Sequence, residues 1–255
     1  MEGKIKLSTI IPIYNKEKAL RQTLQSIVDN HEIDDNLYEC VLVDDESADS
    51  SPEICKEFCE KYPYFKYIRI FNDGHHTPAN ARNYGLDICK GEYIHFLDAD
   101  DIICKTFYKD GTRMLDETMK DVFIRGYYNC FENNTRIKYN VYLSDLLGPP
   151  LCSSIFRNYI KDIKFEPVLS QDIIFTWIAM QGHEYHDDRK NYVSFIYYKE
   201  FSEVSKQQTS LPFPNNVVQV LQKYDTYKFK LNENNIAVTK STNELVTMEN
   251  IGLKK

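Results

Sequence analysis

The sequence has no excess of positive charge, no long apolar run and no regular cysteine spacing, and each absence excludes a class of protein. Its 255 residues contain 31 Lys and Arg against 38 Asp and Glu, which gives a net charge of −7. Binding to the phosphates of a nucleic acid needs clustered Lys and Arg, so we expect no nucleic-acid partner. An acidic protein can still bind a diphosphate when a divalent cation supplies positive charge locally.

The apolar runs are all much shorter than the roughly 20 residues of a membrane-spanning helix, and no signal peptide precedes the first of them. We therefore expect a cytoplasmic protein without a transmembrane span, and peripheral contact with the inner face of the membrane stays open. Cys55 and Cys59 lie one helical turn apart, but no His pair follows at the spacing of a zinc site. The cysteines are thus expected to be reduced thiols.

The first hundred residues alternate buried strands with amphipathic helices. Apolar residues recur at helical spacing between the strands, as Leu20, Leu24 and Ile27 do. Repeated β-α-β units imply right-handed crossovers and predict an α/β fold, a doubly wound and mostly parallel sheet flanked by helices. The expected strands are Leu7–Ile13, Tyr38–Val43, Lys66–Phe71 and Glu92–Leu97.

Beyond residue 101 the pattern is looser. We expect helices near 104–118, 152–160 and 170–181, with strands near Asp121–Gly126 and Val193–Tyr198. From about Leu231 the chain is polar and has no clear apolar period, which favours a tail.

Polar residues gather where the expected strands end, and ligands of doubly wound sheets bind beyond those ends. In an extended segment residues two apart point to the same side, so Asp98 and Asp100 can converge. All-oxygen ligation suits Mg²⁺ or Mn²⁺. After the second strand, a carboxylate of the segment Val43–Ser50 can accept the imide N–H of a uracil ring or bond a ribose hydroxyl. The alternative for each cluster is an acidic turn that only caps the following helix.

The ordered series of these segments resembles glycosyltransferase family 2, which has the A-type, Rossmann-like nucleotide-sugar fold, over roughly residues 7–205. TIIPIYNKE is similar to the family's base-binding turn, VDDESADSS to its VDDGSxDxS segment, and ARNYGLDICKGEYIHFLDADD to the stretch that ends in its metal-binding motif. The segment Gln171–Phe175 resembles the Glu-Asp-x-x-Phe segment that supplies the catalytic base, and Tyr198 through Ser205 resembles a late diphosphate-contacting loop.

The resemblance implies a role for each matched residue. Asp172 would be the catalytic base, and Asp98 and Asp100 would hold Mn²⁺ or Mg²⁺. The nucleotide and the donor sugar would be bound by side chains at the strand ends and in the late loop: Pro12, Tyr14, Asn15, Glu17, Asp44, Asp45, Asn72, Arg82, Asp98, Lys199 and Ser205.

Several residues depart from the family pattern or have no role in it. Glu46 stands where Gly is usual, Gln171 where Glu is usual, and Lys199 where Arg is common. The segment 72–78 is longer than the usual loop, and we expect its His75 and His76 to be exposed and without a role; the alternative is contact with the donor or a metal. The remaining pair, His183 and His186, is expected to be structural or exposed.

The resemblance implies an inverting glycosyltransferase that moves a sugar from a nucleoside diphosphate, with UDP favoured, to a hydroxyl of a glycan or lipid-linked acceptor in cell-surface polysaccharide synthesis. Residues 1–101 would form the nucleotide-sugar-binding half and 102–210 the acceptor-binding and catalytic-base half of a single main domain, before a C-terminal helix and polar tail over 211–255. One alternative is a non-catalytic nucleotide-sugar-binding or scaffold domain. Another is a sugar-1-phosphate nucleotidyltransferase, which normally has a Gly-rich loop where this chain has IPIYNKE.

Overall fold

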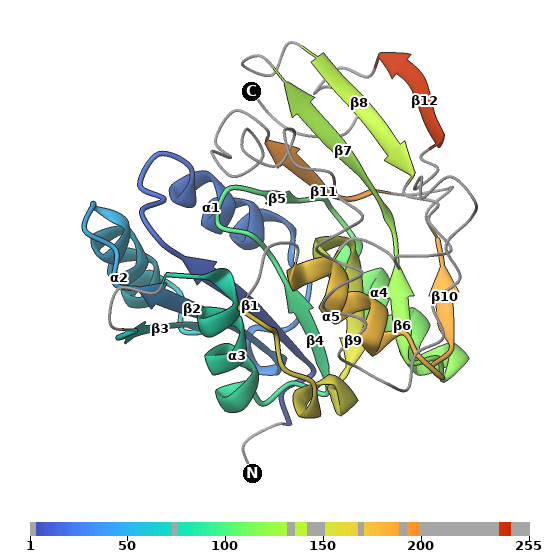
Figure 1. The fold of residues 1–255 in the computed structure, drawn as a ribbon, viewed down its shortest axis with the longest axis horizontal. Coiled ribbons are helices and arrows are strands. Elements are labelled where there is room, and N and C mark those ends of the chain that lie inside the picture. Colours follow the sequence, from blue (N-terminus) through green and yellow to red (C-terminus); the bar gives the residue numbers. More distant parts are fainter. Residues whose placement is uncertain are drawn as a thin grey trace.

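A computed structural model describes residues 4–72, 76–131, 136–141, 151–167, 171–188, 193–198 and 240–245 (Figure 1). Strands and helices alternate up to residue 101, as the sequence predicts. The first half of the chain contains β1 (Leu7–Ile13), α1 (Leu20–Asn30), β2 (Tyr38–Asp45), α2 (Ser51–Lys61), β3 (Phe65–Ile70), α3 (Pro78–Ile88), β4 (Tyr93–Phe96), β5 (Ile102–Ile103) and α4 (Phe107–Thr118). The second half contains β6 (Val122–Ile124), β7 (Gly126–Phe131), β8 (Arg136–Val141), β9 (Ser154–Arg157), α5 (Gln171–Ala179), β10 (Tyr185–Asp187), β11 (Val193–Tyr198) and β12 (Lys240–Leu245).

The main sheet has seven strands in the order β10-β6-β9-β4-β1-β2-β3. Strands β4, β1, β2 and β3 are parallel, and β9 runs antiparallel to its neighbours β4 and β6. The chain winds outward from β1 to β3 and then returns to β4 on the other side of β1. This reversal places the topological switch point between β1 and β4, where doubly wound sheets bind their ligands. The predicted fold class is confirmed.

Hydrophobic residues cover both faces of this sheet, which explains the nearly continuous apolar runs of its central strands. Leu7 and Ile11 pack on one face with Leu24 of α1, whereas Ile10 packs on the other face. Helix α3 lies so close to that second face that a Cβ on Gly85 would stand 2.4 Å from Ile10. Gly85 therefore allows α3 to pack directly on β1.

The prediction of a helix over 152–160 is wrong. This segment contains strand β9 between two short 3₁₀ helices, Leu151–Ser153 and Asn158–Asp162. Ile155 packs in the core on one face of the sheet and Phe156 in the core on the other. A strand inserted between two others is buried on both faces, and so short an apolar run cannot be told from a helical one by its periodicity.

A second, five-stranded sheet has the order β12-β8-β7-β11-β5 and lies at the top of the view in Figure 1. Strand β12 pairs antiparallel with β8, so the part of the chain expected as a polar tail contributes a strand. The helix expected after residue 210 lies outside the described residues.

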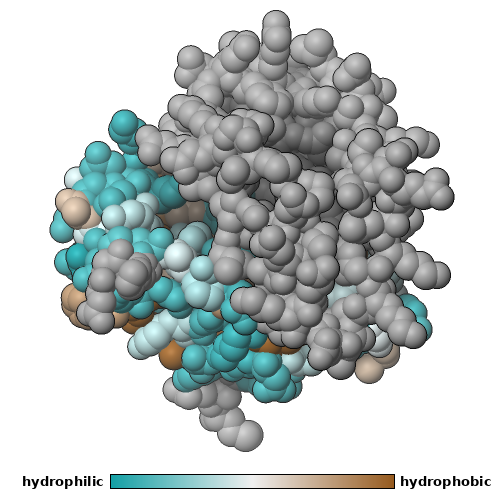
Figure 2. Space-filling view, viewed as in Figure 1, coloured by the Kyte–Doolittle hydropathy of each residue, from teal (hydrophilic) through white to brown (hydrophobic). Residues whose placement is uncertain are grey.

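The described surface in the view of Figure 2 is mostly hydrophilic, with hydrophobic residues in small patches. Large exposed apolar side chains such as Phe71, which follows β3, and Met119, which follows α4, lie in separate segments of the chain. Within the described ranges, every helix is too short or too polar to cross a bilayer.

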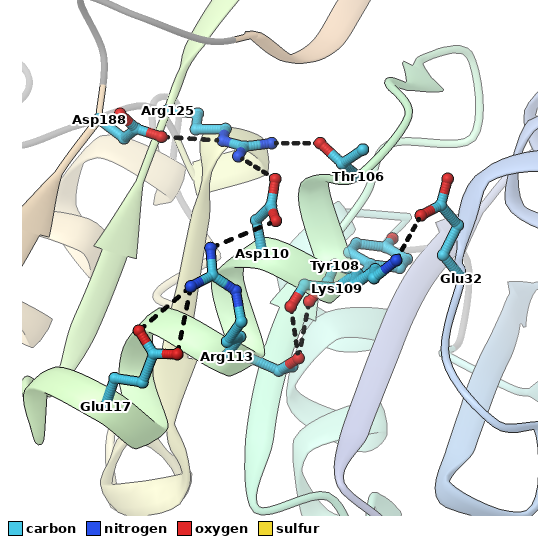
Figure 3. Close-up of polar contacts among 10 residues, drawn as sticks. Glu32, Thr106, Tyr108, Lys109, Asp110, Arg113, Glu117, Arg125 and Asp188 are labelled. Atoms are coloured by element: carbon cyan, nitrogen blue, oxygen red, sulfur yellow. Dashed lines mark hydrogen bonds and ion pairs between the residues drawn. The ribbon is translucent and has the colours of Figure 1, made fainter.

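Arg125 fixes the point at which the chain passes from the main sheet into the second sheet. It lies between β6 and β7, and its side chain is 2% exposed. Its guanidinium donates to Asp110 of α4 at 2.7 Å, to Asp188 at 3.4 Å and to Thr106 at 3.3 Å. Figure 3 draws these three contacts. It also stands over the ring of Phe123. This cation therefore joins α4, β6 and the end of β10.

We expect Arg125→Leu to lower the free energy of unfolding by about 3 kcal/mol, because it leaves two carboxylates without their buried counter-charge. Urea denaturation measures the change. Arg113→Leu is the matched control, since Arg113 also faces Asp110 but is half-exposed. The control should keep the wild-type midpoint. Equal midpoints for Arg125→Leu and the control would contradict a structural role for the buried cation.

Candidate active site

The loops that follow β1 and β2 are hydrogen-bonded to each other. The backbone N–H of Asn15 donates to Ser47 Oγ at 3.0 Å, and the side-chain oxygen of Asn15 accepts from the Ala48 N–H at 2.8 Å. The Glu17 carboxylate accepts from the Ser50 N–H at 3.1 Å. Asn15 and Glu17 thus hold the two loops together here, and their contact with a nucleotide stays a prediction.

Asp44 also has a structural position. It is fully buried, and its carboxylate accepts hydrogen bonds from the Ser47 N–H at 2.9 Å and from the Tyr67 hydroxyl at 2.8 Å. The Arg69 guanidinium stands 3.3 Å away. Pro12, the other residue expected beside the base, is half-buried in β1 opposite Val43.

The structure brings together three residues expected at the nucleotide and donor sugar, Tyr14, Asp45 and Asn72, and adds His76. The amide of Asn72, after β3, donates to Asp45 Oδ1 at the end of β2. His76 Nδ1 lies 3.6 Å from Asp45 Oδ2, and the His76 ring stacks on Tyr14 with centroids 4.3 Å apart. The His76 side chain is 22% exposed, so the expectation that His76 is an exposed residue is wrong. His75 lies outside the described residues.

Glu46 shows how the chain tolerates a large residue where the family has Gly. Its φ is 60°, in the left-handed region that glycine adopts without steric cost. The Glu46 carboxylate accepts the backbone N–H of Asn72 at 3.0 Å. This hydrogen bond offsets the backbone strain and joins the ends of β2 and β3.

Arg82 is the centre of a second group of residues. Its side chain is buried within α3, donates to Asp98 Oδ1 at 2.5 Å and stands over the Phe165 ring at 5.4 Å. Burial raises the pKa of Asp172, and the positive charge of Arg82 opposes this rise. Phe175 stacks on Phe165 with centroids 3.8 Å apart, so α5 begins close to Arg82.

The donors for a divalent cation fit a hard metal ion. Ligand atoms of Asp98, Asp101 and Cys152 lie within 4.8 Å of one another. Burial raises the pKa of the Cys152 thiol, and sulfur is a soft donor that suits a hard cation poorly. Two carboxylates remain, which suit Mg²⁺ or Mn²⁺.

Asp100, the expected partner of Asp98, instead forms an ion pair with Lys16 at 2.5 Å. The expectation assumed an extended segment, whereas the chain turns here and the Asp101 N–H donates to the Asp98 carbonyl at 3.0 Å. A turn brings residues i and i+3 together, which explains why Asp101 joins Asp98. A metal role for Asp100 stays a prediction.

The remaining expected residues divide into two groups. Lys199 and Ser205 lie outside the described residues. His183 stacks on Tyr159 with centroids 3.8 Å apart and has Nδ1 3.0 Å from an Asp121 oxygen, which is a structural position, as expected. His186 stacks on Phe123.

The Lys16–Asp100 pair predicts a coupling in stability. Asp100 is 7% exposed, and burial raises its pKa while Lys16 opposes the rise. Lys16→Met should lower the free energy of unfolding by about 3 kcal/mol, because it leaves a buried carboxylate unpaired. Adding Asp100→Asn should recover most of the loss in urea denaturation. Losses that simply add in the double variant would mean that the two charges do not interact.

A family model described as glycosyl transferase family 2 matches residues 8–181. The chain is similar to the minor teichoic acid biosynthesis protein GgaB of Bacillus subtilis (strain 168), with 38% identity over 118 residues, which make up 46% of this chain and 13% of GgaB. The first three curated relatives are matched over 13%, 20% and 52% of their own lengths, so the chain spans less than two thirds of each.

Two solved structures resemble the fold. Staphylococcus aureus TarS 1–349 in complex with UDP-GlcNAc has a TM-score of 0.69 and 24% identity, over 87% of this chain and 66% of that chain. The mannosyltransferase PcManGT from Pyrobaculum calidifontis in complex with GDP-Man and Mn²⁺ has a TM-score of 0.64 and 18% identity, over 89% of this chain and 66% of that chain.

Proposed function

The chain belongs to glycosyl transferase family 2, and from this premise we propose that it transfers a sugar from a nucleoside-diphosphate donor to an acceptor hydroxyl with inversion. The observation that carries the proposal is the position of Arg82 beside both Asp98 and Asp172. One buried cation thereby brings an acidic cluster at the end of β4 close to a half-buried carboxylate at the start of α5.

The proposed donor is a UDP-sugar. Asp45 would accept the uracil imide N–H, Tyr14 would stack on the ring, and Asn72 orients the Asp45 carboxylate. The UDP-GlcNAc complex of TarS supports this choice. The GDP-Man complex of PcManGT makes a GDP-sugar the alternative donor. Lys199 and Ser205 keep their expected role at the diphosphate.

The proposed cofactor is Mn²⁺ or Mg²⁺, held by Asp98 together with Asp101 or Asp100. The cation would neutralise charge on the departing diphosphate. Arg82 fixes one oxygen of Asp98 through its hydrogen bond. The Mn²⁺ complex of PcManGT supports a divalent cation in this fold.

Asp172 is the proposed general base. The acceptor hydroxyl attacks the anomeric carbon opposite the diphosphate, and the Asp172 carboxylate takes its proton, so one displacement inverts the configuration. Burial raises the pKa of Asp172, which makes its carboxylate a stronger base, and the positive charge of Arg82 opposes this shift and favours the ionised form. A scaffold domain has no need of a carboxylate in this environment.

The proposed acceptor is a hydroxyl of a glycan or lipid-linked polymer at the cell surface. The name of GgaB, a minor teichoic acid biosynthesis protein, supports a cell-wall polymer. In this proposal residues 1–101 bind the donor, and 102–210 receive the acceptor. A nucleotidyltransferase is disfavoured because the loop after β1 has no Gly and is held by side-chain hydrogen bonds.

We expect UDP and Mn²⁺ to bind cooperatively, because the diphosphate completes the oxygen shell of the cation. In calorimetry, Mn²⁺ should tighten UDP binding at least about tenfold, a coupling of about 1.4 kcal/mol. Asp98→Ala should abolish the coupling. Asp87→Ala, an exposed carboxylate of α3, should keep it. Comparing the coupling in Asp100→Asn and Asp101→Asn identifies the second ligand of the cation. Equal UDP affinity of the wild type with and without Mn²⁺ would contradict the metal site.

Asp172→Asn should reduce transfer by about 10²-fold or more, because the amide cannot accept the acceptor proton. The variant should keep its UDP affinity and melt within a few degrees of wild type. The measurement is UDP release from a donor panel, with EDTA as the metal-free control. Asp162→Asn makes the same change at an exposed position and should retain full activity. Near wild-type transfer by Asp172→Asn would remove this residue from the mechanism.

A further inference from the structure

His76 occupies the place that the proposed function assigns to the nucleobase. Its imidazole lies against Tyr14 at an interplanar angle of 16°, and its Nδ1 is directed at Asp45 Oδ2 at 3.6 Å. A uracil ring would need the same two partners, one aromatic face and one carboxylate oxygen. The sequence does not predict this overlap, because His76 lies between the motifs that carry the family resemblance.

The space between the Tyr14 and His76 rings is too narrow for a base. Carbon atoms in contact stand ~3.5–4.0 Å apart, so a base between Tyr14 and His76 would need roughly 7 Å between the two rings. Their centroids are 4.3 Å apart. A base can therefore stack on Tyr14 at this position only after the imidazole has left.

Asp45 Oδ2 is available to a ligand once His76 moves. Asp45 is 2% exposed, and its Oδ1 already accepts the Asn72 amide. Its Oδ2 accepts no hydrogen bond from the described residues, since 3.6 Å to His76 is longer than a hydrogen bond. Glu46 adds a second carboxylate near the imidazole. A buried acceptor without a donor favours a ligand that brings an N–H.

We propose that His76 is an internal occupant of the base subsite, which the nucleobase of the donor must displace before it can bind. The proposal rests on the proposed function, because it assumes that Tyr14 and Asp45 receive the base. The apparent affinity for a nucleotide then falls in proportion to the fraction of molecules whose subsite is open. A ligand without a base, such as pyrophosphate, leaves His76 in place.

His76→Ala tests this directly in calorimetry with Mg²⁺. If the open fraction of the wild type is ~0.03–0.3, the variant should bind UDP about 3- to 30-fold more tightly and bind pyrophosphate as the wild type does. His76→Phe keeps a ring on Tyr14 but loses the nitrogen that faces Asp45. Its UDP affinity should therefore lie between those of the wild type and His76→Ala. His183→Ala is the matched control, because His183 also stacks on a Tyr and pairs with an Asp, away from this subsite.

Proton NMR of the histidine rings gives a second readout. The His76 signals, shifted by the Tyr14 ring, should move toward those of an unstacked imidazole when UDP and Mg²⁺ saturate the protein. The His183 signals should stay where they are. Unchanged His76 signals would overturn the displacement.

The outcomes separate the inference from the function on which it rests. If UDP binds and Asp45→Ala weakens it, but His76→Ala binds UDP no more tightly than wild type, the inference alone is overturned. If wild-type protein does not bind UDP, or if Asp45→Ala binds it equally well, the base subsite is wrong and both fall.

Discussion

The buried guanidinium of Arg82 is the interaction on which the arrangement of the site depends. Asp98 and Asp172 are separated by more than seventy positions in the sequence, and both raise the pKa of Arg82 against the effect of burial. Without that cation, Asp98 and Asp172 would repel each other, since the negative charge of Asp98 already raises the pKa of Asp172. Aromatic packing also positions Asp172. Phe175 of α5 stacks on Phe165 and contacts Phe96 of β4, which holds the start of α5 beside the end of β4.

Some polar residues at the strand ends are bound to neighbouring strands and loops, as Asp44 is, and others lie at the candidate base subsite, as Asp45 does. The alternation of side chains along a strand explains this difference. Successive side chains in β2 point to opposite faces. Asp44 is bound by residues of β3 and by its own loop, whereas Asp45 meets Asn72 and His76. Composition marks the whole segment as acidic, but the pleat of the strand determines which carboxylate can meet a ligand.

The sequence predicts the parts of the structure that follow from strong local patterns. Strand β1 and helix α5 with Asp172 are found where the apolar spacing places them. Long-range pairing decided most of what sequence reasoning missed. The insertion of β9 between β4 and β6 and the stacking of His76 on Tyr14 depend on contacts that no short window of sequence contains. The turn that joins Asp101 to Asp98 is local, and it was missed because an extended backbone was assumed there.

A single displacement inverts the configuration at the anomeric carbon, which binding measurements do not detect. The most direct test is the anomeric configuration of the product, read from the proton coupling constant of the new linkage by NMR. With a UDP-sugar whose sugar is α-linked, attack from the face opposite the diphosphate predicts a β-linked product. An α-linked product would require a second displacement or attack from the same face, and would contradict the assignment of Asp172 as the general base of a single displacement.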